Sequence, residues 1–163
     1  MKEIPLGGKK AAGRVALVDD EDYGLVMGYR WHVKERRRAD RNDGPYAVTT
    51  TPYKSSLGMH QLITGWLMTD HIDRDGLNNQ RSNLRPATRT QNAQNSRPKT
   101  GSSSRFKGVA WHRGVEKWQV TIKADGRHRY LGCFADEEEA ALAYNAAALE
   151  AWGPYAYLNE VAS

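Results

Sequence analysis

The segment that most constrains this chain is residues 95–105, NSRPKTGSSSR, which contains no apolar side chain. A run of Ser, Gly and Pro of this kind is typical of a linker rather than of a core element. It divides a chain of 163 residues, of which only 39% are hydrophobic. Because so low an apolar content supports only modest cores, the sequence predicts small modules on either side rather than one large globule.

Positive charge is concentrated around this segment. Residues 76–115 contain eight Arg or Lys and no Asp or Glu, whereas the rest of the chain contains 16 basic and 19 acidic residues, so the net charge of +5 arises in this window. A solvated basic face is the simplest interpretation of such a run. The absence of any balancing acid favours instead a polyanionic partner, whose phosphates would neutralise the repulsion between like charges.

Membrane and secreted proteins are not indicated. There is no apolar run long enough to span a bilayer and no apolar stretch behind the N-terminal lysines. Cys133 is the single cysteine, which excludes an internal disulfide and a second thiol for a zinc site. These features suit a reducing compartment, and we expect a cytoplasmic protein without a small-molecule cofactor.

Residues 1–58 are rich in aromatic and β-branched side chains, in the runs RVALVD, YRWHV and PYAVTTT, and are predicted to form an N-terminal β region. Within it, the acidic corner at residues 18–22 could suggest a metal site. Adjacent acids at a strand end are more often solvated turn residues, and we interpret them in that way.

Residues 105–160 carry a different pattern. Three strand-like runs, FKGVAWH, KWQVTIKA and HRYLGCF, are separated by short turns, and Asp125 with Gly126 in the second turn favours a tight hairpin. A helix follows, with Asp136 placed to cap its N-terminus and Gly153 just beyond its last turn. Together with the N-terminal strands, this pattern predicts an α+β protein.

The centre of the chain reads TDHIDRDGLNNQRSNLRPATRTQNAQN. Hydrolysis of a phosphodiester at neutral pH needs a base for the attacking water and a cation for the charge that develops on the phosphate. Asp70 and His71 are adjacent, so on an extended strand they point to opposite sides and can serve two tasks. A short helix started by Thr88 or Thr90 would present Asn92. Mg²⁺ prefers oxygen ligands of the kind that Asp70 and Asn92 offer.

In this order, the motifs MHQLI, DHIDRDGLNNQRSNLR and QNAQN resemble those of HNH endonucleases of the phage and intron-encoded type, in the variant that ends in Asn. The resemblance covers residues 59–96 and implies a ββα-metal finger, two strands and a helix around one divalent ion, Mg²⁺ or else Mn²⁺. By position, His71 would be the general base, and Asn83 would brace the loop and orient that base. Asp70 and Asn92 would bind the metal ion.

The same resemblance places Arg85 and Arg89 where they would contact phosphate. His60 and Asn79 also match the family pattern, and we interpret them as structural. The resemblance further implies an origin in a phage, a prophage or another mobile element, and hence a bacterial or phage-infected cell.

Residues 105–160 resemble the APETALA2-type DNA-binding domain, through KGV, KWQVTI, YLGCF, EEEAALAYNAAALEAWG and the closing YLN. The resemblance implies that the three-stranded sheet, rather than the helix, enters the major groove of double-stranded DNA. Ala110 and His112 replace arginines of the plant pattern, so the target sequence does not transfer. A purely structural role for Trp118 stays open, as does a protein partner for this domain. The positions implied to contact or lie near DNA are Arg105, Lys107, Arg113, Trp118, Lys123, Arg127, Arg129 and Tyr130.

The sequence thus predicts a metal-dependent DNA endonuclease of the nicking or homing type. We expect the β region at 1–58, the finger at 59–96, a linker at 97–104 and the DNA-binding domain at 105–160. One finger holds one active site, so nicking by a monomer is expected. Two alternatives remain, a sequence-specific DNA-binding regulator that does not cut and an RNA-binding protein. The intact central motif argues against the first, and the lack of a stacked-aromatic RNA motif argues against the second.

Overall fold

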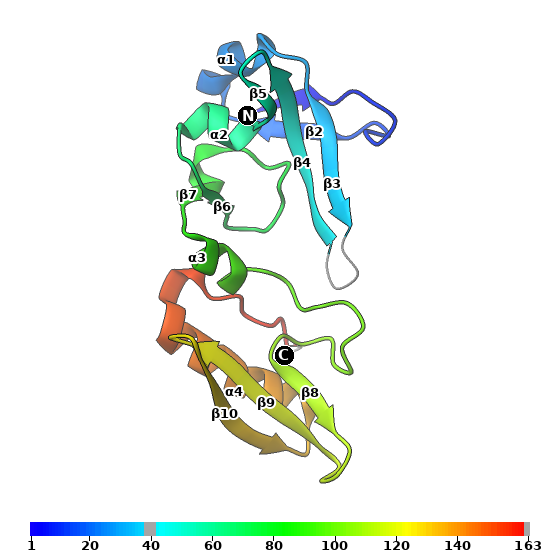
Figure 1. Ribbon diagram of the computed structural model, residues 1–163, viewed down its shortest axis with the longest axis vertical. Helices are drawn as coiled ribbons and strands as arrows, with labels where there is room; N and C mark the ends of the chain where they lie inside the picture. The colour runs from blue at the N-terminus through cyan, green and yellow to red at the C-terminus, as the bar shows by residue number, and fades with distance from the viewer. Residues whose placement is uncertain (38–41, 162–163) are drawn as a thin grey trace. The chain divides into compact units, whose positions relative to one another are not determined.

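The structure is a computed structural model that describes residues 1–37 and 42–161. It belongs to the α+β class, as the sequence predicts, with several small antiparallel sheets and a few helices (Figure 1). Contacts between residues divide the chain into two compact units, Met1–Asn92 and Ala93–Ser163.

The N-terminal unit opens with an antiparallel hairpin and a three-stranded antiparallel sheet. Its first strands, β1 (Lys2–Pro5) and β2 (Val15–Val18), pair with each other. The 3-10 turn η1 (Asp20–Asp22) and the short helix α1 (Tyr23–Met27) lead into the sheet, whose strand order is β3-β4-β5. Its strands are β3 (His32–Arg37), β4 (Asn42–Thr51) and β5 (Lys54–Gly58), followed at once by the helix α2 (Met59–Thr64).

The predicted finger region folds as two strands and a helix in that order. Strand β6 (Thr69–His71) pairs antiparallel with β7 (Leu84–Pro86), and the 3-10 turn η2 (Arg81–Asn83) lies directly before β7. Helix α3 (Arg89–Gln94) follows. The loop between the two strands, residues 72–83, begins directly after His71. It ends directly before Leu84, which lies opposite His71 in the sheet.

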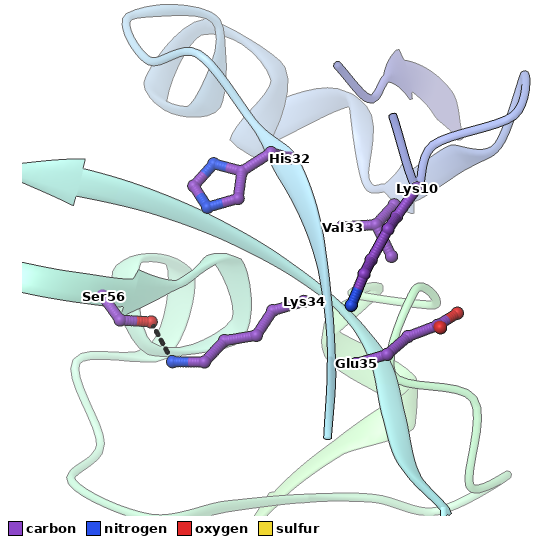
Figure 2. A pocket seen from close by; sticks show the side chains of 6 residues that line it. All are labelled: Lys10, His32, Val33, Lys34, Glu35 and Ser56. Atoms are coloured by element: carbon purple, nitrogen blue, oxygen red, sulfur yellow. Dashed lines mark hydrogen bonds between the residues drawn. The ribbon is translucent and has the colours of Figure 1, made fainter. Parts of the chain in front are cut away.

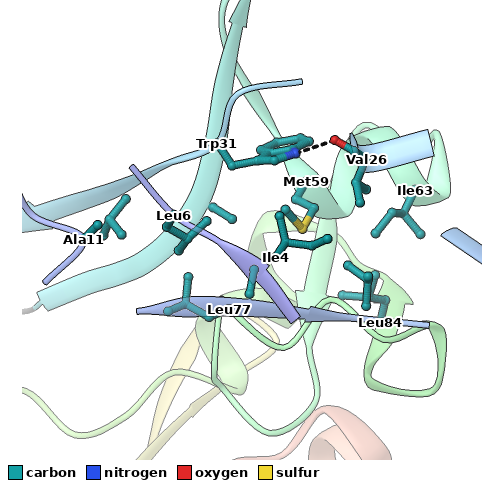
Figure 3. Packing of buried hydrophobic residues seen from close by; sticks show 13 residues of the cluster. Ile4, Leu6, Ala11, Val26, Trp31, Met59, Ile63, Leu77 and Leu84 are labelled. Atoms are coloured by element: carbon teal, nitrogen blue, oxygen red, sulfur yellow. Dashed lines mark hydrogen bonds between the residues drawn. The ribbon is translucent and has the colours of Figure 1, made fainter. Parts of the chain in front are cut away.

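One hydrophobic core joins the N-terminal β region to the finger. Ile4 and Trp31 pack in the same cluster as Met59 and Leu84, although the sequence separates them into two predicted domains (Figure 3). The Trp31 indole Nε1 donates a 2.8 Å hydrogen bond to the Val26 carbonyl, so its one polar atom is satisfied within the core. Burying a side chain of this size stabilises the fold by roughly 1.5–3 kcal/mol. The finger therefore rests on the N-terminal strands instead of forming an independent module.

The C-terminal unit is a three-stranded antiparallel sheet covered by one helix. Strands β8 (Val109–His112), β9 (Lys117–Ala124) and β10 (Arg127–Phe134) lie in the order β10-β9-β8. Asp125 and Gly126 form the two-residue turn between β9 and β10 with φ angles of 51° and 74°, the positive values that a type I′ hairpin requires.

Helix α4 (Glu137–Trp152) begins and ends where the sequence predicts. The Asp136 side chain accepts hydrogen bonds from the main-chain N–H groups of Glu138 and Glu139, and Gly153 is the C-cap. A short 3-10 turn, η3 (Gly153–Tyr155), follows. In the part of the chain that the structure describes, no helix combines the length and apolar content needed to cross a membrane.

The predicted linker is attached to the C-terminal unit at both of its ends. The Lys107 ammonium donates to the main-chain carbonyls of Ala93, Gln94 and Ser96, at 3.1, 2.6 and 2.8 Å. At the other end, the Ser104 hydroxyl donates to Glu137, a residue of α4, over 2.6 Å. Polar side chains that look like solvated linker residues in the sequence thus form contacts within the fold.

Among the described residues, Tyr144 of α4 is the largest fully buried side chain, and its ring packs directly against Gly108. A Cβ atom at Gly108 would lie 2.0 Å from a Tyr144 ring carbon, closer than any real contact. Gly108 also has a φ of +78°. The glycine is therefore required both for space and for backbone conformation.

We predict that Gly108→Ala destabilises the C-terminal unit by about 3 kcal/mol or more, the sum of a left-handed backbone and an overpacked core. Gly126→Ala is the matched control, because Gly126 has a similar φ of +74° but no atom within 4 Å of the added Cβ. That control should cost only about 1 kcal/mol. Urea unfolding followed by tryptophan fluorescence measures both, and equal losses would contradict the packing argument.

Candidate active site

Asp70 and His71 are both buried on strand β6, with exposed fractions of 7% and 6%. In the antiparallel register, Asp70 lies opposite Arg85 and His71 lies opposite Leu84. Successive residues of a strand point to opposite faces. The two side chains consequently have different surroundings, as the sequence analysis expects for two different tasks.

Arg85 forms an ion pair with Asp70. Its Nη2 and Nε atoms lie 2.6 and 2.8 Å from Asp70 Oδ2, and the Arg85 side chain is only 14% exposed. The sequence predicts that Arg85 contacts phosphate, and that contact stays a prediction. In this structure the guanidinium offsets the charge of a buried carboxylate that would otherwise be costly to bury.

Asn92 lies on α3, beside β6. Its Nδ2 atom is 3.4 Å from the Thr69 carbonyl, and its Oδ1 atom is buried without a hydrogen-bond partner among the described residues. The helix that carries it starts at Thr88, one of the two predicted positions: the Thr88 hydroxyl accepts from the Gln91 N–H, and the Gln91 side chain accepts from the Thr88 N–H. A buried amide oxygen without a partner costs about 1–3 kcal/mol, so this atom is suited to a ligand.

The oxygen donors of Asp70 and Asn92 fit a hard divalent cation. A carboxylate and an amide oxygen are ligands that Mg²⁺ accepts, with water and substrate phosphate completing its shell. Across residues 1–37 and 42–161, no group of three or more His, Cys, Asp or Glu side chains is placed to hold a metal.

Asn83 braces the loop between β6 and β7. Its Oδ1 accepts a 3.0 Å bond from the Asp73 N–H, and its Nδ2 donates to the Asp73 carboxylate and to the Asn78 carbonyl, both at 2.9 Å. Asp73 in turn accepts from the Asp75 N–H at 2.8 Å. These contacts hold the loop, and the role of Asn83 in the reaction stays a prediction. The side chain that approaches His71, however, is a different one.

His71 lies among two aromatic rings and an amide. Its Nε2 is 3.4 Å from Asn79 Oδ1, and its ring centroid is 5.1 Å from that of His60 and 5.8 Å from that of Tyr46. Asn79 is fully buried. The interpretation of His60 and Asn79 as structural residues thus omits their contacts with His71. The doublet of asparagines at positions 78 and 79 is the feature of the sequence that could have indicated the contact of Asn79.

Burial disfavours the charged form of both histidines. It lowers the pKa of His71, an effect that the hydrogen bond to Asn79 and the nearby Asp73 and Asp70 partly oppose. Burial also lowers the pKa of His60 to about 3, and His71 adds to the effect. A neutral His71 imidazole is the form that can accept a proton from water at neutral pH.

The acidic corner positions η2, which carries Asn83. Asp22 is 3% exposed and accepts from Nε and Nη2 of Arg81 at 2.9 and 2.8 Å. Asp19 accepts from the Arg81 main-chain N–H at 2.8 Å and from the Gln80 side chain at 3.1 Å. The interpretation of this corner as solvated turn residues is wrong for Asp22, because its partner lies 59 residues away in the sequence.

The candidate DNA contacts of the C-terminal sheet fall on both of its faces. Val120 and Ile122 are buried, so the residues that alternate with them on β9, including Lys123, lie on the opposite face. Tyr130 pairs with Thr121 and shares that outer face. Arg129 pairs with Ile122, which places it on the helix-side face, in the exposed first half of β10.

Trp118 belongs to the helix-side face and packs against the C-terminal core, with its ring 5.0 Å from that of Trp111 in an edge-to-face arrangement. Lys107 donates to the three carbonyls described above, and Arg105 pairs with Glu138 at 3.0 Å. Their predicted contacts with DNA stay predictions. Exposed positions are occupied by Arg89, Arg113, Lys123, Arg127, Arg129 and Tyr130.

A separate hollow lies on the N-terminal sheet, between β3 and β5 (Figure 2). Lys34 reaches into it and donates a 2.7 Å hydrogen bond to the Ser56 hydroxyl, and Lys10 approaches from the β1–β2 connection. None of the residues predicted for catalysis or metal binding lines it. The finger is accordingly the candidate active site.

Comparison with known proteins agrees with this assignment at a general level. Over 153 residues, 93% of this chain and 78% of the relative, the sequence is 29% identical to "Uncharacterized HNH endonuclease L560" of Acanthamoeba polyphaga mimivirus. Over 58 residues, 36% of this chain, it is 36% identical to "Protein 3.8" of Escherichia phage T7 and covers 48% of that protein.

The C-terminal third is similar to plant proteins. Over 67 residues it is 37% identical to "AP2-like ethylene-responsive transcription factor At2g41710" of Arabidopsis thaliana, of which it covers 16%. No family model matches the chain, and no solved structure matches it significantly. These similarities suggest a nuclease and a DNA partner, without finer detail.

The buried histidines lead to a prediction about pH. The pKa of His60 falls from 6.5 to about 3 on folding. The unfolded chain therefore takes up a proton on His60 at a higher pH than the folded chain does. The free energy of unfolding is consequently unaffected by His60 above about pH 6.5 and decreases as the pH falls from 6.5 toward 3. The loss can reach about 1.4 kcal/mol per pH unit within that window.

Urea unfolding of the N-terminal unit at pH 7, 6 and 5 measures this loss. His60→Gln should reduce the slope of stability against pH, whereas His32→Gln, at an exposed histidine, should retain the slope of the unsubstituted protein. Identical slopes for all three proteins would contradict the placement of His60.

Proposed function

We propose that this protein is a divalent-metal-dependent DNA endonuclease of the HNH type, which nicks duplex DNA as a monomer and selects its target through the C-terminal unit. The observation that carries the proposal is the arrangement of the finger. Buried His71 lies next in the chain to Asp70, and the partnerless Asn92 oxygen is held against the same strand. The similarity to a protein named as an HNH endonuclease supports it.

His71 is the base of the proposed reaction. Its neutral imidazole takes the proton from a water molecule, whose oxygen attacks the phosphorus atom while the bond to the leaving sugar oxygen breaks. Asp70 and Asn92 would hold a divalent ion such as Mg²⁺, which would stabilise the negative charge on the phosphate and on the leaving oxygen. Asn83 fixes the loop that follows His71, and Arg89 lies exposed at the start of α3, where it can contact a neighbouring phosphate.

The C-terminal unit supplies target choice. A finger that contacts phosphates gains little sequence information from them, whereas a sheet in the major groove can read base edges. Tyr130 and Lys123 both lie on the outer face of the sheet, where Tyr130 is placed to reach base edges and Lys123 to contact a phosphate. A second binding module on the same chain also raises the local concentration of the cleavage site.

One observation favours a second candidate, a DNA-binding regulator that does not cut. The plant proteins similar to the C-terminal third are named as transcription factors. The buried and undisturbed arrangement of Asp70, His71, Asn83 and Asn92 favours the nuclease instead, because a binding relic has no need of a buried, partnerless amide oxygen.

The direct test is conversion of supercoiled plasmid to the open-circular form in Mg²⁺. His71→Ala should lower the rate by about 10²–10⁴-fold, the range typical of a lost general base, with DNA affinity unchanged. His32→Ala, at an exposed histidine outside the finger, should cut as the unsubstituted protein does. Tight binding without any cleavage, in Mg²⁺ and in Mn²⁺, would overturn the nuclease and leave the regulator.

The metal ligands should give a different response. Asp70→Ala and Asn92→Ala should shift cleavage to higher Mg²⁺ concentration, and Mn²⁺ should restore part of the rate because water can replace a missing oxygen ligand. A titration of the rate against each ion measures the shift. An unchanged metal dependence in both variants would remove these residues from the ion site.

The DNA-binding face can be tested with a pair of lysines. Lys123→Ala should weaken binding to all duplexes and reduce the slope of log K against log salt by about 1, as expected for one lost phosphate contact. Lys107→Met should instead lower thermal stability, because its ammonium is bound by three carbonyls of the chain. Fluorescence anisotropy across a salt series distinguishes them, and an unaltered slope for Lys123→Ala would contradict its assignment.

A further inference from the structure

The candidate base needs a partner that fixes its orientation and its tautomer. A neutral imidazole carries its hydrogen on one ring nitrogen and a lone pair on the other, and only the second can accept a proton from water. Which nitrogen carries the hydrogen depends on what the other groups around the ring can donate or accept. Around His71, the Asn79 side chain lies in hydrogen-bond range of Nε2, at 3.4 Å.

The orientation of the Asn79 amide follows from its own contacts. Its Nδ2 donates a 3.0 Å hydrogen bond to the Leu77 carbonyl, and a carbonyl can only accept. The nitrogen end of the amide is thereby directed to Leu77, and the oxygen end is directed to His71. Amide orientation assigned in this way rests on the hydrogen-bond network, which here permits one choice.

The N-terminal hairpin holds Asn79 in place. The Asn79 main-chain N–H donates to the Leu17 carbonyl at 2.8 Å, and the Leu17 N–H donates to the Leu77 carbonyl at 2.8 Å. Leu17 belongs to β2, so a strand of the core presents the amide to the histidine. Asn79 has no exposed surface, and water does not compete for its oxygen.

We propose that Asn79 is the positioning residue for His71, holding its imidazole as the Nε2–H tautomer so that Nδ1 is the nitrogen that accepts the proton. An amide oxygen can only accept, so the nitrogen facing it must be the donor. The distance of 3.4 Å is long for a hydrogen bond, and such contacts commonly tighten when substrate binds. The role assigned to this nitrogen in catalysis rests on the proposed nuclease function.

Asn79 and Asn83 thus have different roles beside His71. Asn83 bonds to Asp73 and to the Asn78 carbonyl and keeps the loop in shape, whereas Asn79 contacts the ring itself. The sequence analysis gives both the brace and the orientation of the base to Asn83. The geometry assigns the orientation to Asn79. Loss of either side chain should therefore affect the enzyme in a different way.

The test is the tautomer of His71, measured by two-bond ¹H–¹⁵N correlation NMR at pH 7.5 on the full chain labelled with ¹⁵N-histidine. His71→Gln identifies its signals. The unsubstituted protein should show the Nε2–H pattern for His71, and a predominant Nδ1–H pattern would overturn the proposal. This measurement needs neither DNA, metal nor cleavage, so it stands even if the protein proves not to be a nuclease.

Three variants separate positioning from general stability. Asn83→Ala should retain the Nε2–H pattern, because it removes only the loop brace. Asn79→Asp should retain it too, because one carboxyl oxygen accepts from the same nitrogen, but it should lower stability because the other oxygen cannot donate to the Leu77 carbonyl. Asn79→Ala should give a mixture of tautomers, and its rate of plasmid nicking should fall by about 10–100-fold, as when an orienting partner is removed.

The outcomes of the two proposals are distinguishable. If the unsubstituted protein nicks plasmid and Asn79→Ala retains both its tautomer and its rate, the role of Asn79 is wrong and the nuclease stands. If the Nε2–H pattern is present and depends on Asn79 but no plasmid is cut, the nuclease is wrong and the positioning contact stands. If Asn79→Ala fails to fold, the tautomer of His71 in the unsubstituted protein and in Asn79→Asp decides whether the role of Asn79 is correct.

Discussion

The candidate site depends on the antiparallel register of two three-residue strands. Leu84 on β7 is buried in the N-terminal core, and it lies opposite His71. A slip of one residue would exchange the two faces of the strand and exchange the surroundings of Asp70 and His71. With so few ladder hydrogen bonds, the pairing cannot be stable alone. The core that holds Leu84 and the contacts that hold the intervening loop must maintain it.

Those contacts come from outside the finger. Arg81 in η2 is bound by Asp22, and Asn79 is bound through the main chain of Leu17, so the acidic corner and the first hairpin both reach the loop between β6 and β7. An ion pair to an almost fully buried carboxylate is costly to break, because the remaining charge has no partner. The N-terminal β region is thus the frame on which the histidine is positioned, and this explains why the two share one core.

Local signals in the sequence were sufficient for the elements themselves. The Asp125–Gly126 turn and the Asp136 cap each depend on a few neighbouring residues, and the structure contains both. The order of strand, strand and helix in the finger was implied by the resemblance of its motifs, and the structure contains it too. The contacts of Asn79 and Arg81 could not be found in this way. Each depends on a partner that only the tertiary fold brings near, and no periodicity or spacing encodes such a pair.

The charge pattern shows the same limit. The central window has eight cations and no acid, which favours a polyanion, yet at least four of the eight are engaged within the chain. Arg81 and Arg85 pair with Asp22 and Asp70, Arg105 pairs with Glu138, and Lys107 is bound by carbonyls. Acids distant in sequence thus neutralise charges that appear unbalanced in the window. A count of basic residues overstates the number of phosphates that the window can hold, and the salt dependence of DNA binding should be correspondingly shallower.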